Sequence, residues 1–329
     1  MKLAIVILNW NGKALLQQFS PSVISHSPEA DIYVIDNAST DDSVFFLKTE
    51  FPDVKIIINS ENGGYAKGYN EGLKHVDADI YCLLNNDIEV SPNWLQPIIE
   101  TFKTQPNTAV IQPKILDFKN REYFEYAGAA GGFIDKYGYP FCRGRIFDTL
   151  EKDLGQYNAE EDIFWATGAC LFIRSSVFKS LQGFDEHFFA HMEEIDLCWR
   201  AKNLNHTIKC VPASTVYHVG GATLQSSNPQ KTYLNFRNSL YTLVKNASGN
   251  IFGIIFMRLL LDGLAAVKFL IALKPFHIVS ILKAHFKFYL HLPRLLKQRK
   301  TTLKTKNYFT VRSIVWAYFV KKNKNFNQL

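Results

Sequence analysis

The chain has 329 residues, of which 14% are aromatic and 20% are charged, which excludes a disordered chain and allows one large domain or two ordinary ones. The net charge of +7 is uneven, because residues 251–329 contain 15 Lys and Arg but a single acid, Asp262. The whole chain has 37 basic and 30 acidic residues, so residues 1–250 contain 22 basic and 29 acidic residues. An acidic body therefore precedes a basic tail.

The cysteines and the N-terminus indicate a reducing compartment. The five cysteines form no CxxC pair, and four of them lie in apolar or helical surroundings, as small buried residues do. Only six apolar residues follow Lys2 before Asn9, too few for the core of a signal peptide. We therefore expect the body of the protein to stay in the cytoplasm.

Three apolar runs in the first 60 residues indicate strands. These runs cover residues 3–8, 32–35 and 54–58. The first run shows no alternation, which is typical of a strand buried on both faces of a parallel sheet. Helical patterns start at Lys13 and cover residues 44–47, with Ser39 or Thr40 as the expected cap of the second helix. Strands that alternate with helices predict a doubly wound nucleotide-binding half.

A polar loop is expected after each of these runs. Asn9 and Asn11 follow the first run, Asp36 ends the second, and residues 62–72 follow the third. Glycines in residues 62–72 would let the backbone approach a ligand closely, and N–H groups there suit phosphate. Because the segment is not GxGxxG and does not follow the first strand, an ordinary NAD site is not expected.

The next apolar run, residues 80–84, leads into Asn85, Asn86 and Asp87. The pattern indicates a buried strand that delivers a carboxylate to its C-terminal end, where open α/β sheets bind ligands. The same three residues are also compatible with a plain hydrophilic turn. Beyond them, the sequence predicts a helix over residues 92–102 and a less regular region over residues 103–160.

The later elements carry a second group of acids. Residues 164–174 indicate a buried strand and residues 175–181 a short helix. Glu193 and Glu194 would lie in the first turn of a further helix, where the macrodipole favours acids even without a catalytic purpose. Short strands are then expected over residues 208–211 and 215–219. His218 lies near the end of the second strand, where its side chain is compatible with a structural role or with a role as a ligand.

Taken together, the motifs resemble the inverting family 2 glycosyltransferases of the GT-A fold, most closely the bacterial rhamnosyltransferase-like enzymes of cell-surface polysaccharide. The matching segments are residues 5–12, 34–43, 62–72, 83–90, 167–174, 183–189 and 193–200, with His218 and residues 233–238. The resemblance implies an α/β fold with a mixed sheet flanked by helices and a nucleotide-diphosphate sugar donor, UDP- or dTDP-linked.

The resemblance also assigns a metal site. Asp87 matches the last acid of the DxD-like motif of this family, which holds a divalent cation, Mg²⁺ or Mn²⁺. His218 aligns with a histidine at the metal or diphosphate site of some relatives. Such a cation neutralises the charge that develops on the diphosphate leaving group.

The donor pocket and the base are implied in the same way. Asp36 matches an acid that contacts the nucleoside, and an acid there would repel phosphate. The other residues expected around the donor are Asn9, Asn11, Asn62, Gly63, Tyr65, Lys67 and Asn86. Inversion needs one general base for the acceptor hydroxyl, and Glu194 occupies its position. The relatives usually have Asp there, so either the pocket adjusts to the longer Glu194, or Glu193 shares the role.

The tail, residues 246–329, is expected to follow a catalytic domain of residues 1–245. Residues 251–273 are long enough to span a bilayer, but Arg258, Asp262 and Lys268 oppose insertion. We therefore expect amphipathic helices over residues 251–296 that lie on the membrane. Their expected breaks are Pro275 and Pro293, and their expected anionic-lipid contacts are Lys297, Arg299, Lys300, Lys304 and Lys306. Alternatively, the helices pack on the body; nucleic acid is not expected, because no such motif appears.

The sequence thus predicts an inverting glycosyltransferase on the inner face of the cell membrane. It would move a sugar, with rhamnose as one candidate, to a lipid-linked or polysaccharide acceptor. A sugar-nucleotidyltransferase is the alternative enzyme, but it usually has a Gly-rich basic loop after the first strand, where this chain has one glycine, Gly12. A catalytically idle, membrane-bound assembly partner is a further alternative, against which Asp87, Glu194 and Asp196 argue together.

Overall fold

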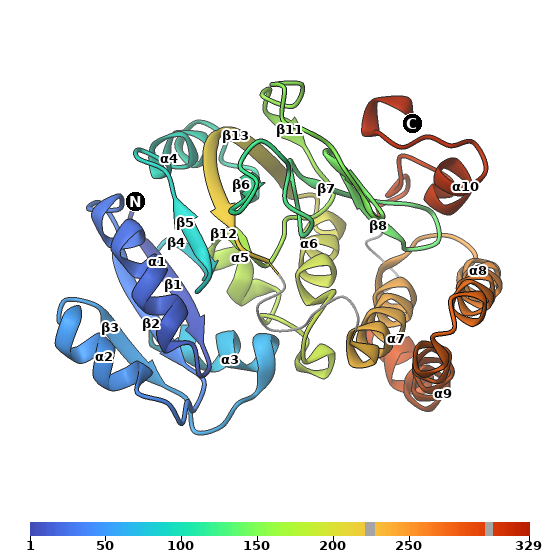
Figure 1. The fold of residues 1–329 in the computed structure, drawn as a ribbon, viewed down its shortest axis with the longest axis horizontal. Coiled ribbons are helices and arrows are strands. Elements are labelled where there is room, and N and C mark those ends of the chain that lie inside the picture. The colour runs from blue at the N-terminus through green and yellow to red at the C-terminus, as the bar shows by residue number, and fades with distance from the viewer. Residues whose placement is uncertain (221–227, 300–304) are drawn as a thin grey trace.

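The computed structural model describes residues 1–220, 228–299 and 305–329. The main element of these residues is a nine-stranded mixed sheet (Figure 1). Its strands are β1 (Leu3–Asn9), β2 (Asp31–Asp36), β3 (Lys55–Ile58), β4 (Ile80–Asn85), β5 (Ile88–Val90), β6 (Thr108–Asp117), β11 (Glu161–Asp162), β12 (Cys170–Arg174) and β13 (Thr207–His218). They lie in the order β11-β13-β6-β12-β4-β1-β2-β3, with β5 paired to β13, and β4, β1, β2 and β3 run parallel.

The centre of the sheet is buried on both faces. Leu3, Ile5 and Ile7 of β1 belong to one hydrophobic core, and Ala4 and Val6 belong to the other. The first core is covered by α1 (Lys13–Ser25), α2 (Ser43–Glu50) and α4 (Leu95–Thr104), and the second by α3 (Gly64–Gly72), α5 (Ser175–Ser180) and α6 (Glu193–Asn203). The predicted α/β class, and a first strand buried on both faces, are confirmed.

The region expected to be irregular, residues 103–160, contains the ten-residue strand β6. Pro113 and its polar neighbours Gln112 and Lys114 concealed this strand in the sequence. In the structure, Lys114 Nζ contacts Asp153 Oδ2 at 2.7 Å, and Gln112 Nε2 donates to the Gly128 carbonyl at 3.0 Å. The rest of the region adds a four-stranded antiparallel sheet among the described residues: β7 (Gly132–Ile134), β8 (Pro140–Cys142), β9 (Arg145–Ile146) and β10 (Thr149–Leu150).

Two predicted short strands, residues 208–211 and 215–219, form the single strand β13. The register of β13 against β6 shifts between Val211 and Thr215, directly beside Pro113. Proline has no N–H for a ladder hydrogen bond, so a bulge in the partner strand is a favourable solution there. The strand predicted over residues 164–174 is shorter than expected, because β12 begins only at Cys170.

Two local predictions near the donor segments were wrong. Residues 62–72, predicted as a loop, form helix α3 from Gly64 onward, and Gly64 has a φ of +72°. Neither Ser39 nor Thr40 caps α2, because the N-cap position is Asp42. Ser39 Oγ instead accepts a hydrogen bond from the Asn11 N–H, which links this segment to the loop after β1.

The C-terminal part is helical and lies at one side of the molecule (Figure 1). Its helices are α7 (Pro229–Asn246), α8 (Ile251–Ile271), α9 (Pro275–Gln298) and α10 (Ile314–Phe319). Pro275 starts α9 as expected, but Pro293 lies inside the helix and does not break it. Phe288 and Leu295, on either side of Pro293, are buried, and this packing keeps the helix continuous. Short 3-10 turns cover Leu73–His75, Glu186–Phe188 and Phe326–Gln328.

The tail contacts the body at several points. The Tyr308 hydroxyl donates to the Lys136 carbonyl at 2.7 Å, and the Ile314 N–H donates to Asp135 Oδ2 at 2.9 Å. Among the described residues, no helix is long and apolar enough to cross a membrane. Lys300 and Lys304 of the predicted basic cluster lie outside the described residues. The division at residue 245 stays a prediction.

Candidate active site

The polar ends of three parallel strands meet at one edge of the sheet. The register pairs Asn9 with Asp36 and Leu8 with Asn85, so β1, β2 and β4 end side by side. Asn9 and Asp36 are both buried, and Asn9 Nδ2 donates to Asp36 Oδ2 at 3.2 Å. This edge brings together the carboxylate and amide side chains that the sequence placed around a donor.

The neighbouring loops are joined by the same side chains. Asn86 Nδ2 donates to Asn9 Oδ1 at 3.0 Å, and Asn11 Oδ1 accepts from the Thr40 N–H at 2.7 Å. Gly12 is required for this packing, since a Cβ there would lie 2.3 Å from Asn86 Nδ2. Asn9, Asn11 and Asn86 are thus held in place before any ligand is bound.

The third expected donor segment lies on both sides of the start of α3. Asn62 Oδ1 accepts from the Gly64 N–H and from Asn37 Nδ2, both at 3.0 Å, and Gly63 is the N-cap of α3. Lys67 forms an ion pair with Glu61 at the surface. Asn62 and Gly63 therefore lie beside the strand ends, whereas the ammonium group of Lys67 already has an acidic partner.

Tyr65 connects this segment to the second group of acids. Its hydroxyl donates to the Gly168 carbonyl at 2.8 Å, and its N–H donates to the Phe189 carbonyl at 2.9 Å. Burial raises the pKa of the Tyr65 hydroxyl well above its usual value, and Tyr69, Glu193 and Glu194 add to the increase. Tyr65 is therefore a neutral, buried link between the donor side and the start of α6.

Asp87 and His218 are neighbours because of strand pairing. Asp87 lies in the tight turn between β4 and β5, and β5 pairs with β13 so that Ile88 is opposite His218. Asp87 Oδ1 is 3.1 Å from His218 Nε2, and both side chains are buried. The two alternatives for residues 85–87 are therefore compatible, since a polar turn delivers this carboxylate.

Sequence reasoning missed Glu125 as a third member of this group. Glu125 Oε2 is 3.3 Å from His218 Nδ1, and Glu125 is buried. Burial alone would lower the pKa of His218, but the interactions with Asp87 and Glu125 outweigh it and raise the pKa to about 10. No local signal marks Glu125, which follows β6 and reaches His218 only through the fold.

The residues around Asp87 supply only some of the ligands that a divalent cation needs. Asp87 and His218 form an ion pair with each other, so the imidazole would have to give up its Nε2 proton before that nitrogen could bind a cation. The Asp87 carboxylate, together with diphosphate and water oxygens, would suit Mg²⁺ or Mn²⁺. Within the described residues, no group of three or more His, Cys, Asp or Glu side chains is arranged to hold a metal ion. The remaining ligands would have to come from a bound donor and from water.

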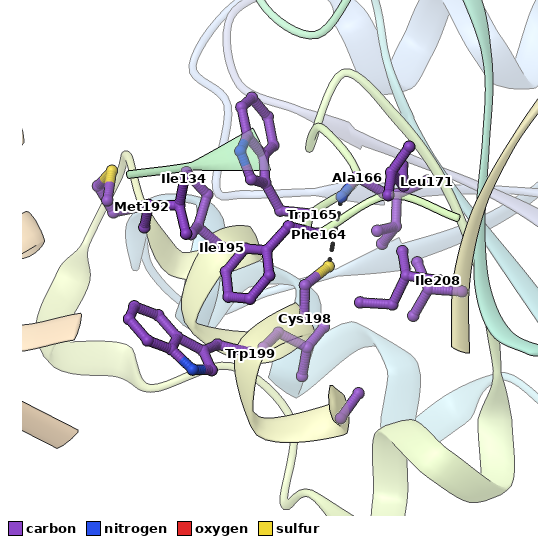
Figure 2. Packing of buried hydrophobic residues seen from close by; sticks show 14 of the residues in the cluster. Ile134, Phe164, Trp165, Ala166, Leu171, Met192, Ile195, Cys198, Trp199 and Ile208 are labelled. Carbon is purple, nitrogen blue, oxygen red and sulfur yellow. Dashed lines mark hydrogen bonds between the residues drawn. The ribbon is translucent and has the colours of Figure 1, made fainter. Parts of the chain in front are cut away.

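Glu193 and Glu194 begin helix α6, as the sequence predicts. Figure 2 shows Ile195, Cys198 and Trp199 of this helix packed in the core, with Cys198 Sγ accepting a hydrogen bond from the Ala166 N–H at 3.5 Å. This packing fixes α6 against the sheet, so its first turn holds the two carboxyl groups in a defined place.

The two carboxyl groups are buried and incompletely bonded. Burial raises the pKa of Glu194 to about 7, and it raises that of Glu193 well above the usual value, with the charge of Glu194 adding to the increase. Oε2 of each residue is buried and has no hydrogen-bond partner among the described residues. A buried, unpartnered carboxyl oxygen is costly, and it is an acceptor ready for a ligand hydroxyl.

The turn before α6 is strained and is held by α7. Phe189, His191 and Met192 all have φ values between +65° and +73°. Asn238 Nδ2 donates to the Phe188, Ala190 and His191 carbonyls at 2.7–3.1 Å. Strain of this kind persists only where surrounding contacts enforce it. Asn238 belongs to the quoted segment 233–238, but its positioning role was not predicted.

Asp196 links α6 to α7 and does not face the site. Its carboxylate contacts Arg200 Nε at 2.8 Å, Lys245 Nζ at 3.0 Å and Asn246 Nδ2 at 2.7 Å. Burial would raise the pKa of Asp196, but Lys245 and Arg200 outweigh it and lower the pKa. Asp196 therefore supports the position of Glu193 and Glu194.

The model of the family "Glycosyl transferase family 2" matches residues 4–181, just over half of the chain. A low-salt glycan biosynthesis hexosyltransferase of Haloferax volcanii is 25% identical over 244 residues, covering 72% of this chain and 73% of that protein. An N-acetylglucosaminyl-diphospho-decaprenol L-rhamnosyltransferase of Mycobacterium tuberculosis is 23% identical over 231 residues, covering 66% of this chain and 75% of that protein.

Among solved structures, GalNAc-T7 with UDP, GalNAc and Mn²⁺ superimposes with a TM-score of 0.55 at 18% identity. The match covers 66% of this chain and 43% of that one. It supports the expected GT-A fold, with the mixed sheet and flanking helices described above.

Proposed function

The chain belongs to glycosyl transferase family 2, and on this premise we propose that it moves a sugar, with inversion, from a nucleoside-diphosphate donor to a lipid-linked or polysaccharide acceptor. That the protein is a glycosyltransferase with a GT-A fold follows from the family. The observation that carries the proposal is the pair of buried, unpartnered carboxyl oxygens of Glu193 and Glu194 at the start of α6.

We assign the donor to the edge formed by β1, β2 and β4. Asp36 would accept hydrogen bonds from the nucleoside, because a carboxylate would repel the diphosphate. Asn9, Asn11, Asn62, Gly63 and Asn86 would line the same end. A UDP- or dTDP-linked donor is our first choice; the GalNAc-T7 structure contains UDP, and the related Mycobacterium tuberculosis enzyme is a rhamnosyltransferase.

The diphosphate end belongs near Asp87 and His218. A divalent cation bound there, Mn²⁺ or Mg²⁺, would stabilise the negative charge of the leaving diphosphate. Glu125 contacts the second ring nitrogen of His218 and so fixes the orientation of the imidazole, as an outer partner of a ligating histidine does. The Mn²⁺ in the GalNAc-T7 structure is consistent with this choice of ion.

Glu194 is the proposed general base. It would take the proton of the acceptor hydroxyl while that oxygen attacks the anomeric carbon, and a pKa of about 7 suits a base at neutral pH. Burial and the charge of Glu194 also raise the pKa of Glu193, its neighbour in the first turn of α6. We place this reaction at the inner face of the cell membrane, where a lipid-linked acceptor is available.

A donor screen tests the proposed function. The correct nucleotide sugar, at 100 times its dissociation constant and with Mn²⁺, should add about 2.7 kcal/mol to the free energy of unfolding. The melting temperature should then rise by roughly 5 °C. Asp36→Ala should lose most of this shift, measured against its own ligand-free melting temperature. A shift that is equal in Asp36→Ala, or absent for every donor, would contradict the assignment.

A further inference from the structure

The outward faces of α8 and α9 are apolar. On α8 the exposed large apolar side chains are Phe252, Phe256, Met257, Leu260, Leu264, Val267, Leu270 and Ile271. On α9 they are Phe276, Val279, Leu282, Phe286, Tyr289, Leu290 and Leu296. We call these fifteen residues, with Leu273 in the turn between the helices, the apolar face. Soluble proteins rarely expose a continuous patch of this kind unless it binds a partner or a membrane.

Helix α8 buries charged side chains and exposes apolar ones, which is the reverse of a surface helix of a soluble protein. Its buried residues include Arg258 and Asp262, which are 3% and 0% exposed. Arg258 Nε is 2.7 Å from Asp262 Oδ1, and the Tyr139 hydroxyl donates to the same carboxylate at 2.7 Å. His285 Nε2 of α9 lies 3.1 Å from Asp262 Oδ2. Arg258 and Asp262, two of the three charges that opposed membrane insertion in the sequence, are thus paired inside the protein, and the apolar residues face outward.

The charge around the apolar face is positive. Asp262 is the single acid of residues 251–329, and it is buried in an ion pair. The exposed or partly exposed cations of the two helices and their turn are Lys268, Lys274, Lys283, Lys287, Arg294 and Lys297. A second copy of this chain would bring the same positive charge against it, whereas an anionic lipid surface would complement it. An apolar face with a basic margin is the pattern of helices that lie in the membrane interface.

We propose that the apolar face of α8 and α9 docks in the plane of a lipid bilayer with an anionic surface. The helices would lie in the interface without crossing it, in agreement with the absence of a membrane-crossing helix among the described residues. Phe252, Phe256 and Leu264 would enter the acyl region from α8, and Leu282 and Phe286 would enter it from α9.

A groove extends the apolar face toward the catalytic body. It has a volume of about 480 Å³ and lies between α7 and α9. Its wall includes Tyr233 from α7 and Phe276, Val279, Lys283, Phe286 and Lys287 from α9. The other side of α7 carries Asn238, which holds the turn before Glu193. Docking would therefore bring lipid next to the helix that positions the catalytic acids, so an acceptor carried by a lipid is accessible from the bound surface.

Vesicle flotation of the full-length chain tests the docking surface. The wild type should float with vesicles of phosphatidylcholine and phosphatidylglycerol, and more weakly with phosphatidylcholine alone. A face variant, Phe256→Gln/Leu264→Gln/Leu282→Gln, changes side chains that are 62–63% exposed, so it should fold normally. Its partition onto vesicles should fall at least about tenfold. The matched control, Phe45→Gln/Ile58→Gln/Leu154→Gln, changes residues that are 60–79% exposed on α2, β3 and the turn after β10, and it should float as the wild type does.

Three results would overturn the docking surface. The first is that the face variant floats as well as the wild type, and the second is that the wild type does not float at all. The third is that the wild type forms dimers without lipid, and that the face variant abolishes these dimers but leaves flotation unchanged. Light scattering and circular dichroism report the oligomeric state and the folding of each variant. Docking does not require the transfer reaction. The donor-induced melting shift should be the same in the face variant, so failure of docking and failure of the proposed function give different results.

Discussion

Asp87→Ala should reduce metal-dependent turnover by at least about 100-fold while the protein stays folded. A divalent cation contributes several kcal/mol to stabilising the leaving-group charge, and each 1.36 kcal/mol corresponds to about tenfold in rate. Asp87 carries the single carboxylate of the turn between β4 and β5, and its neighbours Asn85 and Asn86 cannot supply a second charge. Loss of this carboxylate therefore removes the anionic ligand from the predicted site.

Two further variants make this prediction specific. Asp87→Asn keeps the size of the side chain and should lose nearly as much activity, since the charge is what is removed. Asp53→Asn, in the exposed turn before β3, should leave turnover unchanged. Initial rates against Mn²⁺ concentration measure the effect. Near-normal, Mn²⁺-saturable activity in Asp87→Ala would show that the metal is held elsewhere.

Glu194→Gln should lower kcat by about 10²- to 10⁴-fold, the range typical of general-base catalysis. Glutamine has nearly the same shape but cannot take a proton, so the donor affinity should stay within a few-fold of the wild type. Glu193→Gln should cost less, because Glu193 only influences the charge of its neighbour. Glu100→Gln, on the exposed side of α4, is the matched control. A larger loss in Glu193→Gln than in Glu194→Gln would assign the base to Glu193.

The pH dependence follows from the same residue. Burial raises the pKa of Glu194 to about 7, so the carboxyl group is protonated below that pH and cannot act as a base. The rate should fall about tenfold for each pH unit below 7 and should level off above it. Glu194→Gln should lose this dependence. A wild-type profile that is flat between pH 5 and pH 8 would contradict a base with a raised pKa.

The sequence was a good guide where the signal was local. The unbroken apolar runs that became β1 and β4 end in polar residues, and parallel strands place those ends at one edge. The contact between Asn9 and Asp36 follows from this rule alone. The helix expected to begin at Glu193 and Glu194 is likewise present as α6, with both acids in its first turn.

The sequence was a poor guide where the contact partners are distant along the chain. Glu125 meets His218 only because the loop after β6 returns to the end of β13. Strand β6 was missed because Pro113 interrupts its apolar pattern, and a bulge in β13 that accommodates proline is visible only in the folded pair. Similarly, the sequence showed Arg258 and Asp262 as obstacles to membrane insertion, whereas the fold pairs them inside the protein.

The products of one reaction distinguish a glycosyltransferase from the two alternatives, a sugar-nucleotidyltransferase and a catalytically idle assembly partner. We would incubate the full-length chain with a panel of UDP-, dTDP- and GDP-sugars, a lipid-linked acceptor and Mn²⁺, and analyse all phosphate-containing products. We predict a nucleoside diphosphate in equal amount to the glycosylated acceptor, no pyrophosphate, and loss of both products with EDTA that Mn²⁺ restores. Pyrophosphate as the product, or no product with any donor while the protein is folded, would contradict a metal-dependent glycosyltransferase.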